Sequence, residues 1–412
     1  MKKIISYNFK KFNSYNNKEL NAAKKVIKSG ELSNFLAEKG DKFLGGKYVK
    51  KFEYEIRKYF KVKNAITVNS WTSGLICAVG SLDVQPGDEI IVTPWSMCAS
   101  AICILHWNCI PVFVDIEEDK FCLDPKKIES KISKKTKAIL IADIFGQSSD
   151  IFKIMKIAKK YNLKVISDSA QAPGSKINNK YTGTISHIGG FSLNYHKHIH
   201  TGEGGIIVTN NNKLAKRMRL IRNHAEASIG DKDDLNNMIG HNFRMGEIEA
   251  AMGIEQLKKL KNILKKKIYI ANLLSKYLSS LAGIITPVVR DKCTHVYYVY
   301  AIRLDLKKIK NSRKEIVNRL IKLGVQGISE GYTNLSNLRV FQKKKAYGKK
   351  KFPWSINKKI KYNYSNKELK NCENLNNLSL ISFEISLFDL SNKDVFNIYR
   401  AFKKVWSDLK IN

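Results

Sequence analysis

The sequence contains few prolines, few acidic residues and no closely spaced cysteine pairs. Its 412 residues include 7 prolines and 24 glycines, a content that excludes collagen-like and low-complexity proteins. Hydrophobic residues make up 43% of the chain and aromatic residues 10%, which is enough apolar material for a sizeable core and excludes a disordered chain. A chain of this length allows two to four domains, or one large domain with a smaller one.

The seven cysteines form no Cys-x-x-Cys pair. Most of them lie in apolar runs, where a free thiol packs as a small hydrophobic group. We therefore expect a reduced, cytoplasmic protein. Residues 90–105 form a run of sixteen residues without charge. This run is short for a membrane span and contains Pro94, so we predict a buried strand, a turn and a buried helix there, and no membrane association.

Acidic residues are scarce compared with basic ones. Asp and Glu number 36 and Lys and Arg 73, which gives a formal net charge of +37. Such a charge can attract nucleic acid or an anionic membrane. However, only 11 of the basic residues are arginine, the residue that base and phosphate recognition favours. The lysines are spread along the whole chain, and no nucleic-acid-binding motif is present. We expect a solvated lysine-rich surface and keep a basic nucleic-acid-binding protein as an alternative.

Short apolar runs alternate with helical patterns in the first half of the chain. Several of these runs lack polar alternation, which is typical of strands covered on both faces. Strands are predicted at 65–68, 89–93, 111–116, 137–145, 164–167, 189–193 and 205–209. Helical spacing lies between them, for example at 125–133 and 150–161. Strand–helix alternation of this kind predicts an α/β layered sheet.

The second half of the chain has a different character. A proline-free stretch rich in Leu, Ile and Lys predicts a long helix over 245–281. Later elements are predicted as a strand at 294–303 and helices at 313–323 and 392–409. Residues 324–375 are rich in Asn, Lys and Tyr and predict an exposed loop. We place the domain boundary at the long helix, with a large domain and its N-terminal arm at 1–262 and a small C-terminal domain at 263–412.

Three segments of the first half carry residues of chemical interest. Asp168 ends an apolar strand, where α/β sheets bind ligands, although a helix N-cap would look the same. Lys197 lies between a strand end and TGEGG at 201–205, although a surface lysine would also fit there. Thr72 and Ser73 open a helix after a strand. Such a helix start can bind phosphate through its N–H groups and its dipole, or can simply be capped.

Together these segments resemble the DegT/StrS family of sugar aminotransferases, which are fold-type-I enzymes that use pyridoxal 5′-phosphate (PLP). The resemblance covers most of the chain. Its motifs include DIFGQSSD at 143–150, SDSAQAPGS at 167–175, FSLNYHKHIHTGEGG at 191–205 and GHNFRMGEIEAAMG at 240–253. The resemblance implies an α/β fold of the PLP-dependent transferase type I. Such a fold has a large domain with a mostly parallel central sheet flanked by helices, and a smaller C-terminal α+β domain.

The resemblance also implies an activity and catalytic residues. An amino group would pass from glutamate or glutamine to PLP, and from there to a keto sugar, which we expect to be nucleotide-linked, in amino-sugar or polysaccharide biosynthesis. Lys197 would bond covalently to PLP and move protons. Asp168 would keep the ring nitrogen of PLP protonated. Gln171 would hydrogen-bond the ring hydroxyl.

The resemblance implies further residues that hold the phosphate of PLP. Thr72, Ser73 and Ser192 would bind it from one side. Asn242 would reach it from a second subunit, which implies a homodimer with shared active sites. The open alternative is that Asn242 caps the long helix that follows it.

Two features depart from the family pattern. Met97 occupies the position of the aromatic residue that stacks on PLP, and Trp95 lies two residues earlier. His196, His198 and His200 surround the lysine and could bind a metal if they lay in a strand, but we expect no metal, with one histidine at the substrate and the others packed. A sister branch of the family has histidine in place of the lysine and removes a sugar hydroxyl. A dehydratase therefore remains an alternative, with His198 in that place.

Overall fold

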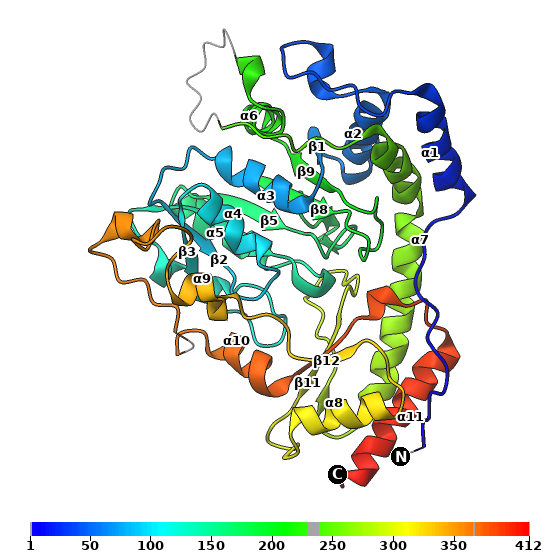
Figure 1. Ribbon diagram of the computed structural model, residues 1–412. Coiled ribbons are helices and arrows are strands. Elements are labelled where there is room, and N and C mark those ends of the chain that lie inside the picture. The colour runs from blue at the N-terminus through cyan, green and yellow to red at the C-terminus, as the bar shows by residue number, and fades with distance from the viewer. Residues whose placement is uncertain (1, 229–238, 366, 412) are drawn as a thin grey trace.

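The computed structural model describes residues 2–228, 239–365 and 367–411. A seven-stranded sheet lies at the centre of the larger part, with strand order β1-β9-β8-β5-β4-β2-β3 (Figure 1). Its strands are β1 (Asn64–Val68), β2 (Glu89–Val92), β3 (Ile110–Phe113), β4 (Thr136–Ala142), β5 (Lys164–Asp168), β8 (Ile188–Ser192) and β9 (Gly205–Thr209). Every one of the seven apolar runs predicted as a strand takes part in this sheet. A separate short hairpin is formed by β6 (Lys176–Ile177) and β7 (Lys180–Tyr181).

The central sheet is mostly parallel. Only β9 runs against its neighbours, β8 and β1. The last residues of β4 and β5, Ala142 and Asp168, lie opposite each other in register. The carboxyl ends of these strands therefore meet at one edge of the sheet, where side chains that follow them can share a site.

Helices cover both faces of the central sheet (Figure 1). Because successive side chains of a strand point to opposite faces, Leu140 and Ile166 pack in one core with α3, α4 and α6, while Ile139 and Val165 pack in another with α5. A third core joins α2 and α7 to β1, β8 and β9. The helices are α2 (Lys47–Phe60), α3 (Trp71–Gly80), α4 (Ala99–His106), α5 (Ile151–Lys160), α6 (Asn212–Arg222) and α7 (Glu247–Leu278).

Helix α7 connects the two parts of the molecule. Its 32 residues span about 48 Å at 1.5 Å per residue. Ile254 and Leu260 pack in the core with α2, whereas Ile270 and Leu274 pack in a separate core at the other end of the helix. No helix among the described residues is long and apolar enough to cross a membrane. The domain division at residue 262 stays a prediction.

A four-stranded antiparallel sheet lies against the second half of α7. Its order is β10-β11-β13-β12, with β10 (Ile284–Ile285), β11 (Tyr300–Leu304), β12 (Ile328–Glu330) and β13 (Leu380–Phe383). The helices on this side are α8 (Arg313–Lys322) and α11 (Asn392–Asp408), and α1 (Asn17–Ser29) packs on the first half of α7. The predicted strand at 294–303 is therefore confirmed only in its last residues, and both predicted helices are confirmed.

Two sequence predictions are wrong. Residues 125–133 form two short 3-10 turns, Pro125–Lys127 and Glu129–Lys131, in place of a helix. Residues 324–375 are not an exposed loop. They contain α9 (Arg339–Gln342) and α10 (Lys370–Asn374), and Leu335, Phe341 and Trp354 are buried in the core beside α3 and α4. These apolar residues are too widely spaced along the chain to produce a periodic pattern.

Candidate active site

A cavity of about 180 Å³ lies at the carboxyl ends of β4 and β5. Six of the eight residues predicted to form a site line it, namely Thr72, Met97, Asp168, Gln171, Ser192 and Lys197. Ser73 and Asn242 are not among its lining residues. Residues separated by more than 100 positions in the chain thus meet at the edge of the sheet where α/β folds bind ligands.

The N-terminus of α3 forms one wall of this cavity. Ser70 is the N-cap of the helix, and its hydroxyl oxygen accepts a hydrogen bond from the backbone N–H of Ser73 at 3.1 Å. The Ser73 hydroxyl bonds to that of Ser70 at 2.9 Å, so it serves the cap. Thr72 and Ser192, which both carry hydroxyl groups, line the cavity. Hydroxyl groups beside the positive end of a helix dipole suit an anion such as phosphate.

Lys197 lies in the cavity wall. Its side chain is 7% exposed, and its Nζ lies 4.2 Å from the centroid of the Tyr298 ring. Within the described parts of the chain, no hydrogen bond or ion pair engages this amine. Burial lowers the pKa of Lys197 to about 8, while the charge of Asp168 acts in the opposite direction. A buried amine with a lowered pKa is partly neutral near physiological pH and can act as a nucleophile or base.

Asp168 is held by three hydrogen bonds. The Trp71 indole N–H donates to Oδ1 at 2.7 Å, and the Ala170 backbone N–H donates to the same oxygen at 3.2 Å. The Ser100 hydroxyl donates to Oδ2 at 2.6 Å. These donors fix the plane of the carboxylate at the cavity. The sequence motif pointed to Asp168 but not to Trp71 or Ser100, which hold it.

Gln171 connects the cavity to the second half of the chain. Its Oε1 accepts from the Phe145 backbone N–H at 2.8 Å, and its Nε2 donates to the Tyr332 hydroxyl at 2.9 Å. The backbone N–H of Tyr298, the residue that covers Lys197, donates to the Phe145 carbonyl at 2.8 Å. The loop after β4 therefore orients both Gln171 and the aromatic cover of the lysine.

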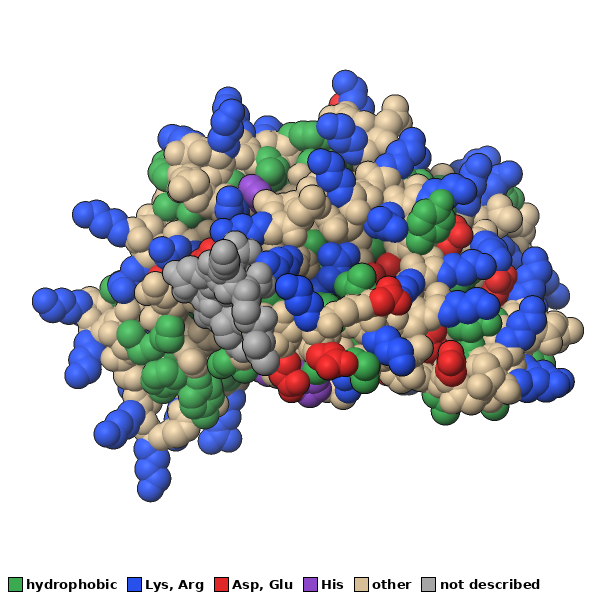
Figure 2. Space-filling view, turned by 90° about the horizontal axis from the view of Figure 1, so that it is seen from above, with side chains coloured by type: hydrophobic (Ala, Val, Ile, Leu, Met, Phe, Trp, Pro, Cys, Tyr) green, Lys and Arg blue, Asp and Glu red, His purple; other side chains and the backbone are tan. Residues whose placement is uncertain are grey.

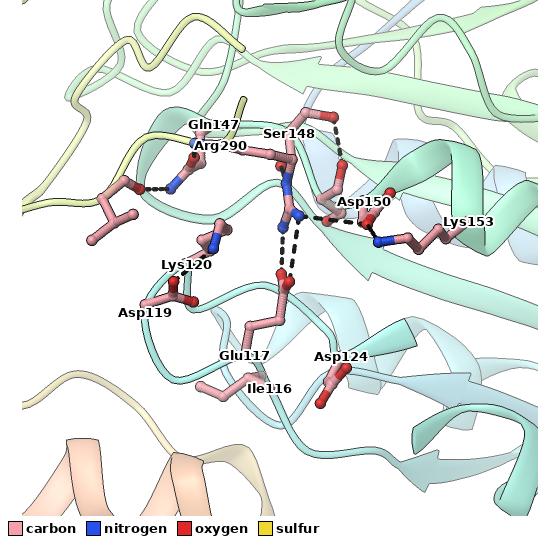
Figure 3. Close-up of polar contacts among 12 residues, drawn as sticks. Ile116, Glu117, Asp119, Lys120, Asp124, Gln147, Ser148, Asp150, Lys153 and Arg290 are labelled. Carbon is pink, nitrogen blue, oxygen red and sulfur yellow. Dashed lines mark hydrogen bonds and ion pairs between the residues drawn. The ribbon is translucent and has the colours of Figure 1, made fainter. Parts of the chain in front are cut away.

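Arg290 anchors the same loop through several polar contacts (Figure 3). Its guanidinium pairs with Glu117 and lies 3.7 Å from Asp150. Its Nε donates to the Ser148 carbonyl at 3.1 Å, and its backbone N–H donates to Gln147 Oε1 at 2.9 Å. This group of contacts ties the chain segment that leads to β11 to the loop that follows β4. None of these residues lines the cavity.

A second buried carboxylate, Asp143, lines the cavity and was not identified from the sequence. The Ser149 backbone N–H donates to its Oδ1 at 2.7 Å, and the Ser169 hydroxyl donates to its Oδ2 at 2.6 Å. Burial raises the pKa of Asp143 to about 6. Since Ser169 follows Asp168 directly, Asp143 supports the turn that carries the Asp168 side chain.

The three histidines around the lysine have different surroundings. His196 lines the cavity. His198 is fully buried, and its Nε2 lies 2.8 Å from the Val296 carbonyl oxygen. His200 packs against the ring of Tyr15. The segment is not a strand, and no group of three metal-binding side chains is found in the part of the chain that is described.

Met97, and not Trp95, reaches the cavity. The Met97 side chain is 56% exposed and lines it. Trp95 is fully buried and packs near the rings of Phe145 and Tyr332. Met97 therefore lies where a residue can cover a flat ligand, and a thioether packs favourably on an aromatic ring.

Asn194 and Glu203 add a polar pair to the cavity wall. The Asn194 Nδ2 donates to Glu203 Oε1 at 2.7 Å. The Asn194 Oδ1 is buried and has no hydrogen-bond partner among the described residues. A buried acceptor without a partner costs free energy, so this oxygen is suited to bind a donor group of a ligand.

Asn242 lies outside the cavity of its own chain. It is exposed, and its Oδ1 accepts from the Arg244 Nε at 2.9 Å. The N-cap of α7 is Gly246. The alternative that Asn242 caps the long helix is therefore wrong.

A buried lysine and a buried carboxylate share a cavity with a helix N-terminus, at the carboxyl edge of a mostly parallel sheet. This arrangement places the protein in the class of α/β enzymes that bind an anionic ligand at such an edge. Residues 29–360 match the model of the DegT/DnrJ/EryC1/StrS aminotransferase family. The chain belongs to this family and is an aminotransferase.

Individual relatives agree with the family assignment. GDP-perosamine synthase of Caulobacter vibrioides is 33% identical over 287 residues, which cover 68% of this chain and 75% of that protein. UDP-4-amino-4,6-dideoxy-N-acetyl-beta-L-altrosamine transaminase of Helicobacter pylori is 33% identical over 278 residues, 66% of this chain and 73% of that protein. The X-ray structure of an aminotransferase from Psychrobacter cryohalolentis, 26% identical, covers 98% of this chain and 100% of its own with a TM-score of 0.82. The fold class expected from the sequence is confirmed.

Proposed function

We propose that this aminotransferase uses PLP to transfer an amino group from glutamate or glutamine to the ketone of a nucleotide-linked sugar. The observation that carries the proposal is that Lys197, and not His198, faces the cavity beside Asp168. His198 is buried and turned toward the Val296 carbonyl. This arrangement favours the transaminase over the dehydratase alternative, which needs a histidine in the place of the lysine.

The residues of the cavity fit PLP. PLP would supply an electron sink and a carrier for the amino group. The N-terminus of α3, with Thr72 and Ser192, would hold its phosphate. Asp168 would accept a hydrogen bond from the N–H of the pyridine ring, and Gln171 would form a hydrogen bond with the ring hydroxyl. Met97 would cover the ring face.

Lys197 would hold the cofactor and move protons. Its Nζ has no polar partner in the described residues, so it is available both for a covalent bond and for acid–base work. In the first half of the reaction the amine would take a proton from the α-carbon of the amino donor. In the second half it would return a proton to the sugar carbon that receives the amino group. A pKa of about 8 lets the same group act in both directions.

Relatives at the same level of identity are named for GDP-linked and UDP-linked sugars. We therefore propose the class, a nucleotide-linked keto sugar, and a role in amino-sugar or polysaccharide biosynthesis. Seven free cysteines support a cytoplasmic location, where thiols stay reduced.

A homodimer with shared sites is part of the proposal. Asn242 is exposed and outside its own cavity, a position that allows it to serve a neighbouring copy. Mixing a Lys197→Ala chain with an Asn242→Ala chain tests this directly. Heterodimers, verified by mass, should regain one intact site in two; no recovery of activity would remove the shared site.

The nucleic-acid alternative has less support. Figure 2 shows Lys and Arg side chains scattered over the face seen from above, with acidic side chains among them. Nucleic-acid binding favours basic groups concentrated in one stripe or patch. A steep dependence of duplex DNA binding on salt would revive this alternative.

The decisive experiment locates the covalent bond. Purified protein incubated with PLP should show a visible absorbance band, which borohydride abolishes, and peptide mass analysis should find the cofactor on Lys197. The chain carries its own control, because Lys267 is also buried with a lowered pKa but lies in a different core. Cofactor found on Lys267 or on a surface lysine would overturn the assignment. Release of 2-oxoglutarate with a panel of nucleotide-linked keto sugars would then identify the substrate.

A further inference from the structure

We propose that Trp71 is a positioning residue for Asp168, seated in a slot that two glycines leave open. This inference rests on the proposed function, since it concerns how the carboxylate meets the cofactor. Trp71 is 5% exposed, opens helix α3 and lines the cavity. Its indole reaches across 97 positions of sequence to Asp168. Nothing in the local sequence pattern assigns such a role to a tryptophan at the start of a helix.

The slot is made by Gly74 and Gly190. A Cβ atom at Gly74 would lie 2.7 Å from the indole Cε3 of Trp71. One at Gly190 would lie 2.1 Å from the indole Cζ3, and also 2.2 Å from the Ile206 carbonyl oxygen of the neighbouring strand β9. Real Cβ atoms essentially never approach other atoms below 3.0 Å. Neither glycine has a positive φ, so the space they leave, and not backbone freedom, explains their presence.

Glycine at these positions is costly for local structure. Gly74 lies inside helix α3 and Gly190 inside strand β8. A glycine within a helix destabilises it by about 1 kcal/mol relative to alanine, and a glycine within a strand also weakens it. Two such costs around one side chain are consistent with a requirement to seat the indole in this orientation.

The indole N–H acts differently from the other donors to Asp168. It can donate but cannot accept a hydrogen bond, whereas the Ser100 hydroxyl can do both. Oδ1, at 2.7 Å from the indole nitrogen, is therefore kept as an acceptor. Together with Ser100 on Oδ2, the indole fixes the plane of the carboxylate. An ionised, fixed carboxylate is what would hold a proton on the ring nitrogen of PLP.

The Trp71→Phe variant separates the effect of the indole N–H from the effect of the aromatic ring. Phenylalanine keeps an aromatic side chain in the slot but cannot donate to Asp168. We expect kcat to fall about tenfold, equivalent to about 1.4 kcal/mol of barrier, with KM for the amino donor changed less than about twofold. Without the indole N–H the Asp168 carboxylate is held less firmly in its plane and stabilises the proton on the ring nitrogen less. The ring then carries less positive charge, so the pH midpoint of the visible band of bound PLP should rise by about half a unit or more.

Trp107→Phe is the matched control. Trp107 is also buried, donates its indole N–H to a backbone carbonyl, that of Ile76 at 2.8 Å, and packs against a glycine, Gly80. It does not line the cavity. This variant should lose a comparable hydrogen bond while kcat and the pH midpoint stay as in the wild type.

The outcomes separate this inference from the proposed function. If the wild type shows no visible band with PLP, the proposed function fails. If the wild type binds PLP and Trp71→Phe matches it in kcat and pH midpoint, the role of Trp71 fails. Should Trp71→Phe not fold, Gly74→Ala decides, because the added methyl group displaces the indole while the tryptophan remains. The same fall in kcat and rise in pH midpoint would support the role, and wild-type values would overturn it.

Discussion

Among the residues that the structure describes, two lysines are buried, and their surroundings are very different. Lys197 is 7% exposed and Lys267 5% exposed. Burial lowers the pKa of Lys197 to about 8 and that of Lys267 to about 7. The first lines the cavity of about 180 Å³ at the central sheet, and the second lines a cavity of about 300 Å³ between α7 and the chain near residue 388.

The two side chains differ in their hydrogen bonds. The Lys267 Nζ donates to three backbone carbonyls, those of Ile385, Ser386 and Phe388, at 2.6 to 3.2 Å. These acceptors stabilise its ammonium form and oppose the effect of burial. Lys197 has only the face of the Tyr298 ring among the described residues. Both lysines are buried, so burial does not distinguish them. The difference is that the hydrogen bonds of the Lys267 amine are satisfied by the fold, whereas the Lys197 amine is available for chemistry.

The largest expected effect is on catalysis at Lys197. Lys197→Ala should lose the covalent link to PLP and reduce transamination by about a thousandfold or more, because the nucleophile and the proton carrier are the same group. Lys267→Met, measured beside it as rate per folded molecule, should retain activity within about twofold. Equal losses in both variants would end the distinction between the two lysines.

Asp168→Asn should have the next largest effect. An amide cannot hold a proton on the ring nitrogen as a carboxylate does, so we expect a fall of about a hundredfold in kcat with the fold intact. Circular dichroism and the melting temperature check the fold. A loss of less than about tenfold, or about 1.4 kcal/mol of barrier, would contradict the role of Asp168.

Lys197→Met should stabilise the cofactor-free protein. The pKa of Lys197 is lowered from 10.5 to about 8, so at pH 7 the folded state holds a charge that burial disfavours. At about 1.4 kcal/mol per pKa unit, removing it should raise the free energy of unfolding by about 3 kcal/mol. Between pH 8 and 10.5 the unfolded state binds more protons, so the stability contributed by this group rises with pH. Denaturant unfolding at pH 7 and pH 10 should therefore show the gain of the variant shrinking at the higher pH.

Lys267→Met should lower the free energy of unfolding, by a smaller amount than Lys197→Met raises it. Three buried carbonyls would lose this donor, and each loss costs about 1 to 3 kcal/mol. Burial lowers the pKa of Lys267 from 10.5 to about 7, so at about 1.4 kcal/mol per pKa unit the removal of the charge offsets about 4 to 5 kcal/mol of that cost. We expect a net loss of about 2 kcal/mol in the free energy of unfolding at pH 7. A variant as stable as the wild type would show that the three carbonyls find other partners.

Local sequence patterns predicted much of the fold. All seven strands of the central sheet were visible as apolar runs, because a strand buried on both faces needs an uninterrupted apolar segment. The long helix α7 was predicted from a proline-free stretch rich in Leu, Ile and Lys, and the terminal helix α11 from its amphipathic pattern. The helix predicted at 125–133 is wrong because a helical spacing of apolar residues over so few positions does not ensure a helix.

The roles of the candidate site residues were predicted from the family motifs and not from hydrophobic periodicity. Asp168, Lys197 and Gln171 were identified by resemblance, and all three line the cavity. Their roles stay predictions. Asp143 was missed although it opens the segment DIFGQSSD, because the predicted strand at 137–145 enclosed it, whereas β4 ends at Ala142 and leaves Asp143 at the strand end.

What the sequence by itself determined is local: which segments form strands and helices, and which residues end the strands at the ligand-binding edge. The tertiary structure alone decided which distant residues meet. It placed the Trp71 indole between Gly74 and Gly190 and against Asp168, and gave Lys267 its three carbonyls while Lys197 received none among the described residues. Hydrophobic periodicity repeats over two to four residues. The contacts of Trp71 with Asp168 and Gly190, and those of Lys267, join positions about 100 apart and depend on how the strands are ordered in the sheet.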